Sequence, residues 1–166
     1  MQPGEIIYRP PVIEDGTPIW KLVRDSGVLD LNSVYCYLLL CKDCSETCAV
    51  AEAKGEILGF VTAYLPPGRK DSLFIWQIGV SSALRGQGVA SRLLQEILQR
   101  ESCRGVRFLE ATIGPSNEAS HALFAALAKR LDAGLSEQPC FDAALFPGES
   151  HEPENLIRIG PFQGFN

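Results

Sequence analysis

The sequence predicts one mixed α/β domain over residues 1–166, and three observations support this prediction. The length of 166 residues suits a single domain with a sizeable core. Short apolar runs typical of strands are interspersed with apolar residues at helical spacing. The expected order is one strand, two helices, three strands, a helix, a strand, a helix and two strands. A dinucleotide-binding fold would instead alternate strands and helices from its first strand.

The expected strands are apolar runs bounded by turn residues. They cover residues 5–9, 47–53, 56–65, 73–80, 106–113, 141–146 and 156–159. Lys54 and Gly55, between the second and third runs, indicate a hairpin. The last two runs flank a polar loop over residues 147–155.

The expected helices begin and end at capping residues. Their predicted caps are Thr17 and Gly27 for the first helix, Asn32 or Ser33 for the second, and Ser116 and Gly134 for the fourth. The second helix, residues 34–41, is apolar around its circumference, which predicts burial or packing against a partner. The third helix, residues 89–98, follows a glycine-rich loop.

Composition and charge narrow the class of protein. Hydrophobic residues make up 46% of the chain and charged residues 21%, as in ordinary globular domains. A net charge of −5 argues against a nucleic-acid-binding surface and is compatible with a cationic substrate. No apolar run approaches the roughly 18 residues of a membrane span. Residues 1–5 do not begin a signal peptide, so the cytoplasm is the expected location.

Six cysteines raise the question of a metal centre or a disulfide framework. The run Cys41-x-x-Cys44-x-x-x-Cys48 fits no standard iron–sulfur or zinc spacing, and neither His121 nor His151 stands at zinc-finger spacing to it. Nothing indicates secretion, so disulfides are not expected either. The sequence therefore predicts no metal site and six free thiols.

The loop between the strand at 73–80 and the helix at 89–98 predicts a phosphate site. Gly86 and Gly88 have no Cβ, so the backbone can approach a ligand closely. The N–H groups at the start of a helix attract anions. Arg85 adds a planar, positively charged donor.

Three phosphate-loop types compete with an ordinary glycine turn here. A Walker A loop is excluded because the required lysine is missing. Residues 86–91 match the dinucleotide pattern G-x-G-x-x-S, with Glu110 at about the expected ~20-residue distance, but Glu110 lies inside a strand and no second βαβ half follows. The third pattern is Arg85-x-x-Gly88-x-Ala90.

This third pattern, together with the element order, resembles the GCN5-related N-acetyltransferase (GNAT) family, whose [QR]-x-x-G-x-[GA] motif holds the pyrophosphate of coenzyme A. The resemblance implies a central, mostly antiparallel sheet that is splayed between strands 4 and 5 and flanked by helices. It also implies that main-chain groups of the central strand bind pantetheine and polarise the acetyl carbonyl. The implied residues for acetyl-CoA are Ile78, Val80, Arg85, Gly86, Gln87, Gly88, Val89, Ala90, Asn117 and Ser120.

Two departures from the family pattern concern the proton-transfer groups. Phe124 stands where the family often has a tyrosine that acts as general acid. The strand at 73–80 carries no carboxylate, although many members place their base there. The proton donor and acceptor must therefore lie elsewhere.

Three separated segments, residues 30–41, 74–77 and 151–161, resemble the L-2,4-diaminobutyrate acetyltransferases of ectoine synthesis. That resemblance implies a homodimer that transfers acetyl from acetyl-CoA to the γ-amine of diaminobutyrate. The implied substrate-binding residues are Asp30, Tyr35, Trp76, Gln77, Asp142, His151 and Glu152. Four carboxylates are available for the cationic substrate, namely Asp30, Asp142, Glu152 and Glu154, and each is equally explained as surface charge.

The γ-amine resembles lysine, with a pKa of about 10.4, whereas an α-amine has a pKa of about 7.7–8.0. Selectivity for the γ position must therefore come from positioning. Tyr35 is the first candidate for the proton-handling group and Glu110, through water, the second. Direct attack in a ternary complex is preferred, because no cysteine has a Cys/His/Asp arrangement visible in the sequence.

Alternative functions remain open at this point. The nearest is a GNAT enzyme for another small amine or for a protein N-terminus. A dinucleotide-binding oxidoreductase or regulator belongs to another class, and an iron–sulfur module comes last.

Overall fold

The computed structural model describes residues 4–148 and 150–163. The expectation about a signal peptide rests partly on residues 1–3, and the predicted polar loop includes residue 149; both lie outside the described residues. The strands are β1 Ile7–Arg9, β2 Ala49–Ala53, β3 Glu56–Tyr64, β4 Ser72–Val80, β5 Phe108–Ile113, β6 Leu135–Phe141 and β7 Glu154–Ile159. The helices are α1 Gly16–Ser26, α2 Val34–Asp43, α3 Val89–Leu98 and α4 Glu118–Arg130.

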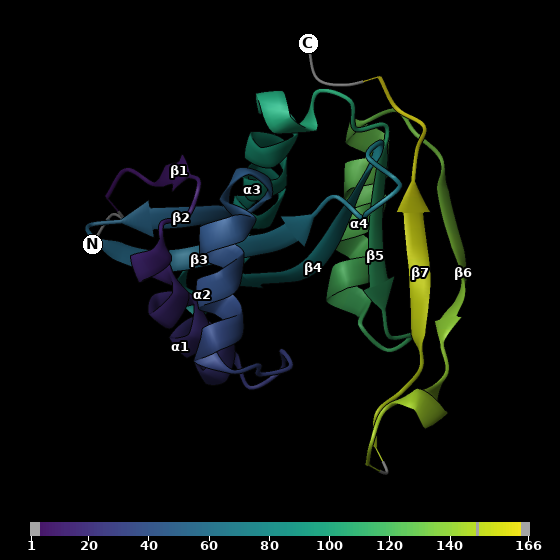
Figure 1. Ribbon diagram of the computed structural model, residues 1–166, viewed down its shortest axis with the longest axis horizontal. Helices are drawn as coiled ribbons and strands as arrows, with labels where there is room; N and C mark the ends of the chain where they lie inside the picture. Colours follow the sequence, from purple (N-terminus) through teal and green to yellow (C-terminus); the bar gives the residue numbers. More distant parts are fainter. Residues whose placement is uncertain (1–3, 149, 164–166) are drawn as a thin grey trace.

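All seven strands form one sheet in the order β1-β2-β3-β4-β5-β7-β6. Its only parallel pair among the described strands is β4–β5, which is aligned for just three residue pairs, from Ser72↔Phe108 to Phe74↔Glu110. Beyond these pairs the two strands separate toward their carboxyl ends (Figure 1). The predicted splayed, mostly antiparallel sheet is thus confirmed.

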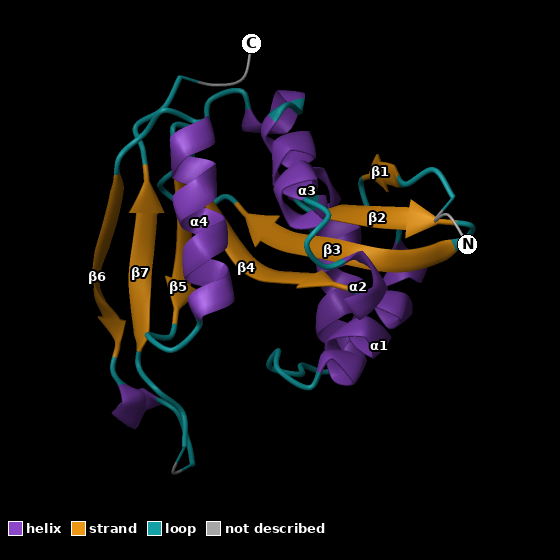
Figure 2. Ribbon diagram, turned by 180° about the vertical axis from the view of Figure 1, so that it is seen from behind, coloured by secondary structure: helices purple, strands orange, loops and turns teal. Residues whose placement is uncertain are grey.

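Helices cover the sheet on both faces (Figure 2). Helices α1 and α2 pack on the β2–β3 region, where Ile19 and Tyr37 meet Phe60 in one buried cluster. Helices α3 and α4 lie on the opposite face, where Leu93 and Phe124 join the larger cluster. The sheet therefore has a hydrophobic core on each face. On the face with the larger core, α3 covers one side of the splay and α4 covers the other.

A β-bulge in β4 sets the direction of the side chains beside the splay. Thr62 of β3 lies opposite Gln77, and the next residue, Ala63, lies opposite Ile75, so Trp76 is an extra residue with no partner. Without the bulge, residues 75 and 77 would point to the same face. With it, Ile75 enters the core beneath α3 while Gln77 faces α2.

The bulged strand also leaves main-chain groups free on one edge. The N–H groups of Gln77 and Ser81 point toward β3, where they donate to the Thr62 hydroxyl and the Leu58 carbonyl. Because backbone groups alternate between the two edges of a strand, those of Ile78 and Val80 point the other way. That edge faces the gap from which β5 has diverged.

The strand predicted at residues 141–146 is wrong. The structure has β6 at Leu135–Phe141 and a short 3-10 turn at Ala143–Leu145. All seven residues of β6 are exposed, so this edge strand has no buried face and no apolar alternation for the sequence to display. Pro139 is tolerated within it because an edge strand does not need every N–H group.

Several predicted caps are also corrected, whereas Ser33 and Gly27 are confirmed. Helix α1 begins at Gly16 after Asp15, because a 3-10 turn over Ile13–Asp15 runs directly into it and places Thr17 inside the helix. Asn117, not Ser116, caps α4 by accepting from the Ser120 N–H group. Helix α4 ends at Arg130, before Gly134, and Asp132 takes the left-handed conformation.

Candidate active site

The loop before α3 has the geometry of an anion site. Gly86 and Gly88 both have φ of +76°, a conformation that favours glycine, and Gly88 is the N-cap of α3. The first N–H groups of a helix have no partner within the helix, so those of Val89 and Ala90 are available to a ligand. The Val89 side chain is buried and anchors the helix start in the core.

The two sides of the splay carry the other predicted acetyl-CoA residues. The free edge at Ile78 and Val80 forms the β4 side. Helix α4 begins after the carboxyl end of β5, so Asn117 and Ser120 lie on the β5 side. The Asn117 side-chain oxygen accepts from the Ser120 N–H group at 3.1 Å, which leaves the Asn117 amide NH₂ as a donor.

A buried polar cluster orders the loop before α2. Tyr37 is fully buried, and its hydroxyl donates to Gln77 Oε1 at 2.9 Å. Gln77 Nε2 in turn donates to the Asp30 carbonyl at 2.7 Å, and the Trp76 ring stacks on Tyr37. The bulged residues of β4 thus hold the segment that carries the Asp30 carboxylate.

That carboxylate reaches across to the segment before β7. Asp30 Oδ2 lies 3.6 Å from His151 Nε2, and the His151 ring stacks on Phe146. The Glu152 carbonyl and then the Asp30 carboxylate raise the pKa of His151. The contact is therefore fully charged below the ordinary imidazole pKa and is lost as the pH rises through the raised value.

Glu154, the first residue of β7, carries the least satisfied carboxylate of this region. Its Oε2 atom is buried and has no hydrogen-bond partner among the described residues. Burial raises the pKa of Glu154, with His151 opposing this effect and Asp30 and Glu152 adding to it. A buried carboxylate without a donor is costly, so this oxygen is suited to an ammonium group of a ligand.

Tyr35, the first candidate for proton transfer, lies on the outer face of α2. Its side chain is 68% exposed, and its hydroxyl makes no hydrogen bond to a described residue. The buried tyrosine of this helix is Tyr37, which the sequence analysis did not single out. The signal for it was available, since Tyr37 stands four residues before buried Cys41, at the spacing of one helical face.

Glu110 and Asp142 are already engaged in other contacts. Glu110 is 1% exposed, and its Oε1 atom accepts from Arg69 at 2.8 Å and from Arg158. It lies opposite Phe74, at the closed end of the splay. The Asp142 carboxylate accepts from the Ala144 N–H group at 2.9 Å and caps a 3-10 turn.

Glu152 and Ser116 form a contact that was not anticipated. Ser116, expected as a helix cap, directs its N–H and hydroxyl groups at the Glu152 carboxylate. Glu152 therefore lies close to the start of α4, and the predicted substrate residues His151 and Glu152 turn toward different neighbours.

The six cysteines are free thiols. Burial raises the pKa of Cys48 to about 12 and that of Cys41 to about 11, so neither carries an appreciable thiolate fraction at neutral pH. Within residues 4–148 and 150–163, no three His, Cys, Asp or Glu side chains are grouped as metal ligands. None of the helices in that part of the chain is long and apolar enough to cross a membrane.

Comparisons with known proteins agree with this geometry. Residues 18–128 match the model of the acetyltransferase (GNAT) family. L-2,4-diaminobutyric acid acetyltransferase from Marinococcus halophilus is 49% identical over 95% of this chain and 91% of its own length. The enzyme of that name from Bordetella parapertussis is 52% identical over 93% of this chain and 83% of its own length.

Solved structures give the same result. Diaminobutyrate acetyltransferase from Paenibacillus lautus, in complex with its substrate L-2,4-diaminobutyric acid and coenzyme A, superposes with a TM-score of 0.93. It is 44% identical, and the match covers 98% of each chain. Ard1 from Thermoplasma volcanium shares the fold at 15% identity, with a TM-score of 0.71 over 93% of this chain and 97% of its own.

Replacing Gly88 by valine is expected to weaken coenzyme A binding by about tenfold or more. A β-branched residue at φ +76° strains the loop on the order of 1–3 kcal/mol, and the loop avoids this by withdrawing its N–H groups from the phosphates. Calorimetric titration with coenzyme A measures the effect. Gly105→Val is the control, because Gly105 does not have a positive φ and a Cβ atom there would have no neighbour within 4 Å. Unchanged affinity in a folded Gly88→Val variant would remove this loop from the site.

Proposed function

The chain belongs to the acetyltransferase (GNAT) family and groups within it with the L-2,4-diaminobutyric acid acetyltransferases, and from this premise we propose that it transfers the acetyl group of acetyl-CoA to the 4-amino group of L-2,4-diaminobutyrate. The product is N4-acetyl-L-2,4-diaminobutyrate, an intermediate of ectoine synthesis. We also propose a cytoplasmic location, since free thiols suit a reducing compartment.

The observation that carries this proposal is the buried Oε2 atom of Glu154, which has no hydrogen-bond partner among the described residues. Diaminobutyrate carries two ammonium groups at neutral pH, and each needs an acceptor when it leaves water. Glu154 lies beside Asp30 and Glu152, so several negative charges are gathered where the α1–α2 loop meets the start of β7. A pocket for a neutral amine would not need this concentration of charge.

The reaction follows from the two halves of the site. One ammonium group loses a proton, and its nitrogen then attacks the acetyl carbon while the C–N bond forms. The N–H groups on the free edge of β4, at Ile78 or Val80, stabilise the oxygen that becomes negative. The nitrogen then gives up a second proton and the C–S bond breaks. The thiolate of coenzyme A takes up a proton, which leaves the neutral amide and the free thiol.

Positioning decides which amine reacts. The α-amine has the lower pKa and is more often unprotonated at neutral pH, so reactivity alone would favour the wrong nitrogen. Acceptors on either side of the pocket, Asp30 from one loop and Glu154 from β7, hold the amino acid so that the γ-nitrogen enters the splay. No covalent acyl-enzyme is required, which agrees with the buried, protonated thiols.

A substrate panel with a Glu154→Gln variant tests this function. The wild-type enzyme is expected to acetylate diaminobutyrate far faster than related diamines or an N-terminal peptide. Glu154→Gln should raise KM for diaminobutyrate about tenfold or more, because a charged hydrogen bond contributes roughly 1.5–3 kcal/mol, with little change in coenzyme A affinity. The wild-type KM should also rise as the pH falls through the raised pKa of Glu154.

Glu101→Gln is the matched control for this variant, because Glu101 is an exposed carboxylate paired with Arg104. Equal rates on another small amine, or binding of NAD in place of coenzyme A, would contradict the proposed function. An unchanged KM in Glu154→Gln would place the ammonium site elsewhere.

Tyr35→Phe is expected to lower kcat and leave KM for acetyl-CoA nearly unchanged. The usual tyrosine position is Phe124, which is buried in the core, so another group must relay protons. General acid–base assistance typically raises the rate by a factor of about 10²–10⁴. Steady-state kinetics at saturating diaminobutyrate measure the effect.

Tyr37→Phe is the comparison, because it removes a buried hydroxyl that holds Gln77. It should lower thermal stability, whereas Tyr35→Phe should not. Near wild-type turnover in Tyr35→Phe would move the role to Glu110 or to water. A raised KM for diaminobutyrate with a normal kcat would make Tyr35 a binding residue.

We propose further that the enzyme is a homodimer. Leu31, just before α2, and Leu39, on α2, are exposed by 48% and 40%. A second copy of the chain would cover these apolar side chains. Light scattering at micromolar concentration should give twice the chain mass of 18.1 kDa.

Leu39→Glu should shift the mass toward the monomer, because it places a charge where an apolar side chain would be covered. Ile7→Glu is the control, as Ile7 is a similarly exposed apolar residue on β1. A wild-type mass near that of one chain would reject the dimer.

A further inference from the structure

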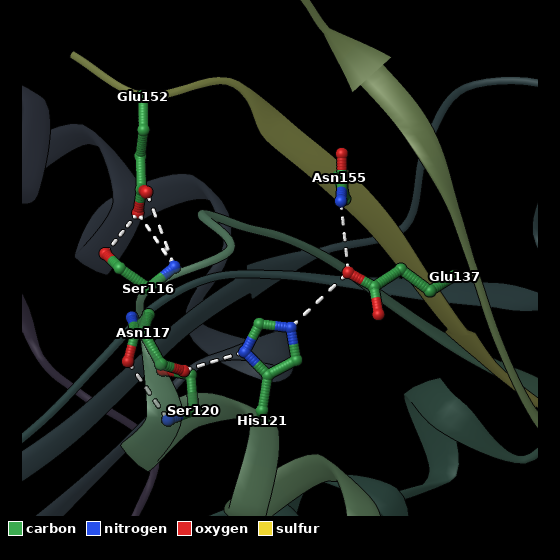
Figure 3. Close-up of polar contacts among 7 residues, drawn as sticks. All are labelled: Ser116, Asn117, Ser120, His121, Glu137, Glu152 and Asn155. Carbon is green, nitrogen blue, oxygen red and sulfur yellow. Dashed lines mark hydrogen bonds and ion pairs between the residues drawn. The ribbon is translucent and has the colours of Figure 1, made fainter.

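The turn between β5 and α4 contacts two different parts of the molecule. Its Asn117 and Ser120 are the proposed pantetheine residues. The preceding residue, Ser116, donates from its hydroxyl to Glu152 Oε1 at 2.7 Å and from its N–H group to both carboxylate oxygens at 3.3 Å (Figure 3). One short turn thus holds residues proposed for acetyl-CoA and a residue from the segment that leads into β7.

Gly114 provides the space for the Glu152 carboxylate. A Cβ atom at this position would overlap the Glu152 side chain, to which its three nearest atoms all belong. Gly114 does not have a positive φ, so the backbone there does not itself demand glycine. The glycine is instead explained by close packing of the carboxylate against the turn.

The position of Glu152 fixes two groups of the amine pocket. His151, which contacts Asp30, is the residue before it, and Glu154 is two residues after it. Consecutive Cα atoms are only about 3.8 Å apart, so a shift of the Glu152 backbone moves His151 directly and Glu154 through Pro153. Release of the carboxylate would therefore loosen the Asp30–His151 contact and the Glu154 carboxylate together.

A second connection joins the start of α4 to β6 and, through β6, to β7. His121, in the first turns of α4, bonds through Nδ1 to the Asn117 carbonyl at 2.8 Å, and its Nε2 lies 3.4 Å from Glu137 Oε1. Glu137 also accepts from the Asn155 amide at 3.1 Å (Figure 3). Asn155 directly follows Glu154, so α4 is tied to the residues on both sides of Glu154.

We propose that Glu152, seated on Ser116 and Gly114, is a positioning residue that couples the binding of acetyl-CoA to the binding of the amine. When the cosubstrate orders the start of α4, Ser116 presents its donors to Glu152, and the residues that bind the amine are held in place. When Glu152 leaves Ser116, the residues that bind the amine are held less firmly, and this is the second state of the site. Coupling of this kind is reciprocal, so the amine must strengthen coenzyme A binding by the same factor. This inference rests on the proposed function.

Calorimetry of the unreactive complex with coenzyme A and diaminobutyrate tests the coupling. The coenzyme A dissociation constant is measured without the amine and with saturating amine. In the wild-type enzyme the amine should lower it at least about fivefold, within the typical range for coupled sites. Gly114→Ala should displace the Glu152 carboxylate without changing any charge and bring the factor close to one. Ser116→Ala should reduce it part of the way.

Two controls and a double variant separate coupling from other effects. Gly105→Ala and Ser102→Ala change the same residue types outside this turn and should keep the full factor. If Glu152 acts through Ser116, the Ser116→Ala/Glu152→Ala pair should lose no more coupling than Glu152→Ala alone. If Glu152 instead contacts the amine directly, Glu152→Ala will weaken amine binding even in the absence of coenzyme A, and the proposed positioning role is wrong.

The outcomes also separate this inference from the proposed function. A wild-type factor of one, or a full factor in folded Gly114→Ala, overturns the coupling while acetylation of diaminobutyrate persists. Absence of diaminobutyrate acetylation by the wild-type enzyme overturns the proposed function itself.

Discussion

One extra residue in β4 determines how the site is built. Because Trp76 has no partner in β3, the strand reverses the faces of its side chains between Ile75 and Gln77. The first part of β4 therefore belongs to the core beneath α3, and the second part presents Gln77 to α2. The same strand leaves its partner β5 after Phe74, so its free edge begins close to the bulge. The main-chain groups proposed to bind the thioester and the side chains that order the loop carrying Asp30 thus share one origin.

The electrostatics of the molecule are divided between two regions. At α3 the exposed backbone N–H groups and Arg85 suit phosphates. Where the α1–α2 loop approaches β7, the carboxylates of Asp30 and Glu154 are the proposed acceptors for ammonium groups. Each region alone is a common feature of protein surfaces, but only the splay of β4 and β5 joins them. In the proposed reaction an anionic cosubstrate and a cationic acceptor meet at this splay.

The carboxylates of the molecule have distinct structural settings. Glu110 is buried but paired with two arginines, and it braces the closed end of the splay. Glu152 is held by Ser116. Glu110 and Glu154 each have a buried Oε2 atom without a hydrogen-bond partner among the described residues, but only Glu154 has Asp30, Glu152 and His151 as its charged neighbours. Residue type does not distinguish these roles, because the distinction lies in the donors that each carboxylate meets.

The fold class, the glycine-rich loop and the family could all be predicted from the sequence alone. These depend on local features: apolar periodicity marks strands and helices, and positive φ at Gly86 and Gly88 requires glycine whatever lies around them. Strand β6 escaped prediction because an edge strand exposed on every residue has no periodicity. It is the packing of distant segments that buries Tyr37, exposes Tyr35 and brings Ser116 to Glu152. These contacts join residues far apart in the chain, so the bulge, the splay and the packing of α4 set their geometry. None of these three features can be predicted from a short stretch of sequence, because each depends on contacts between distant segments.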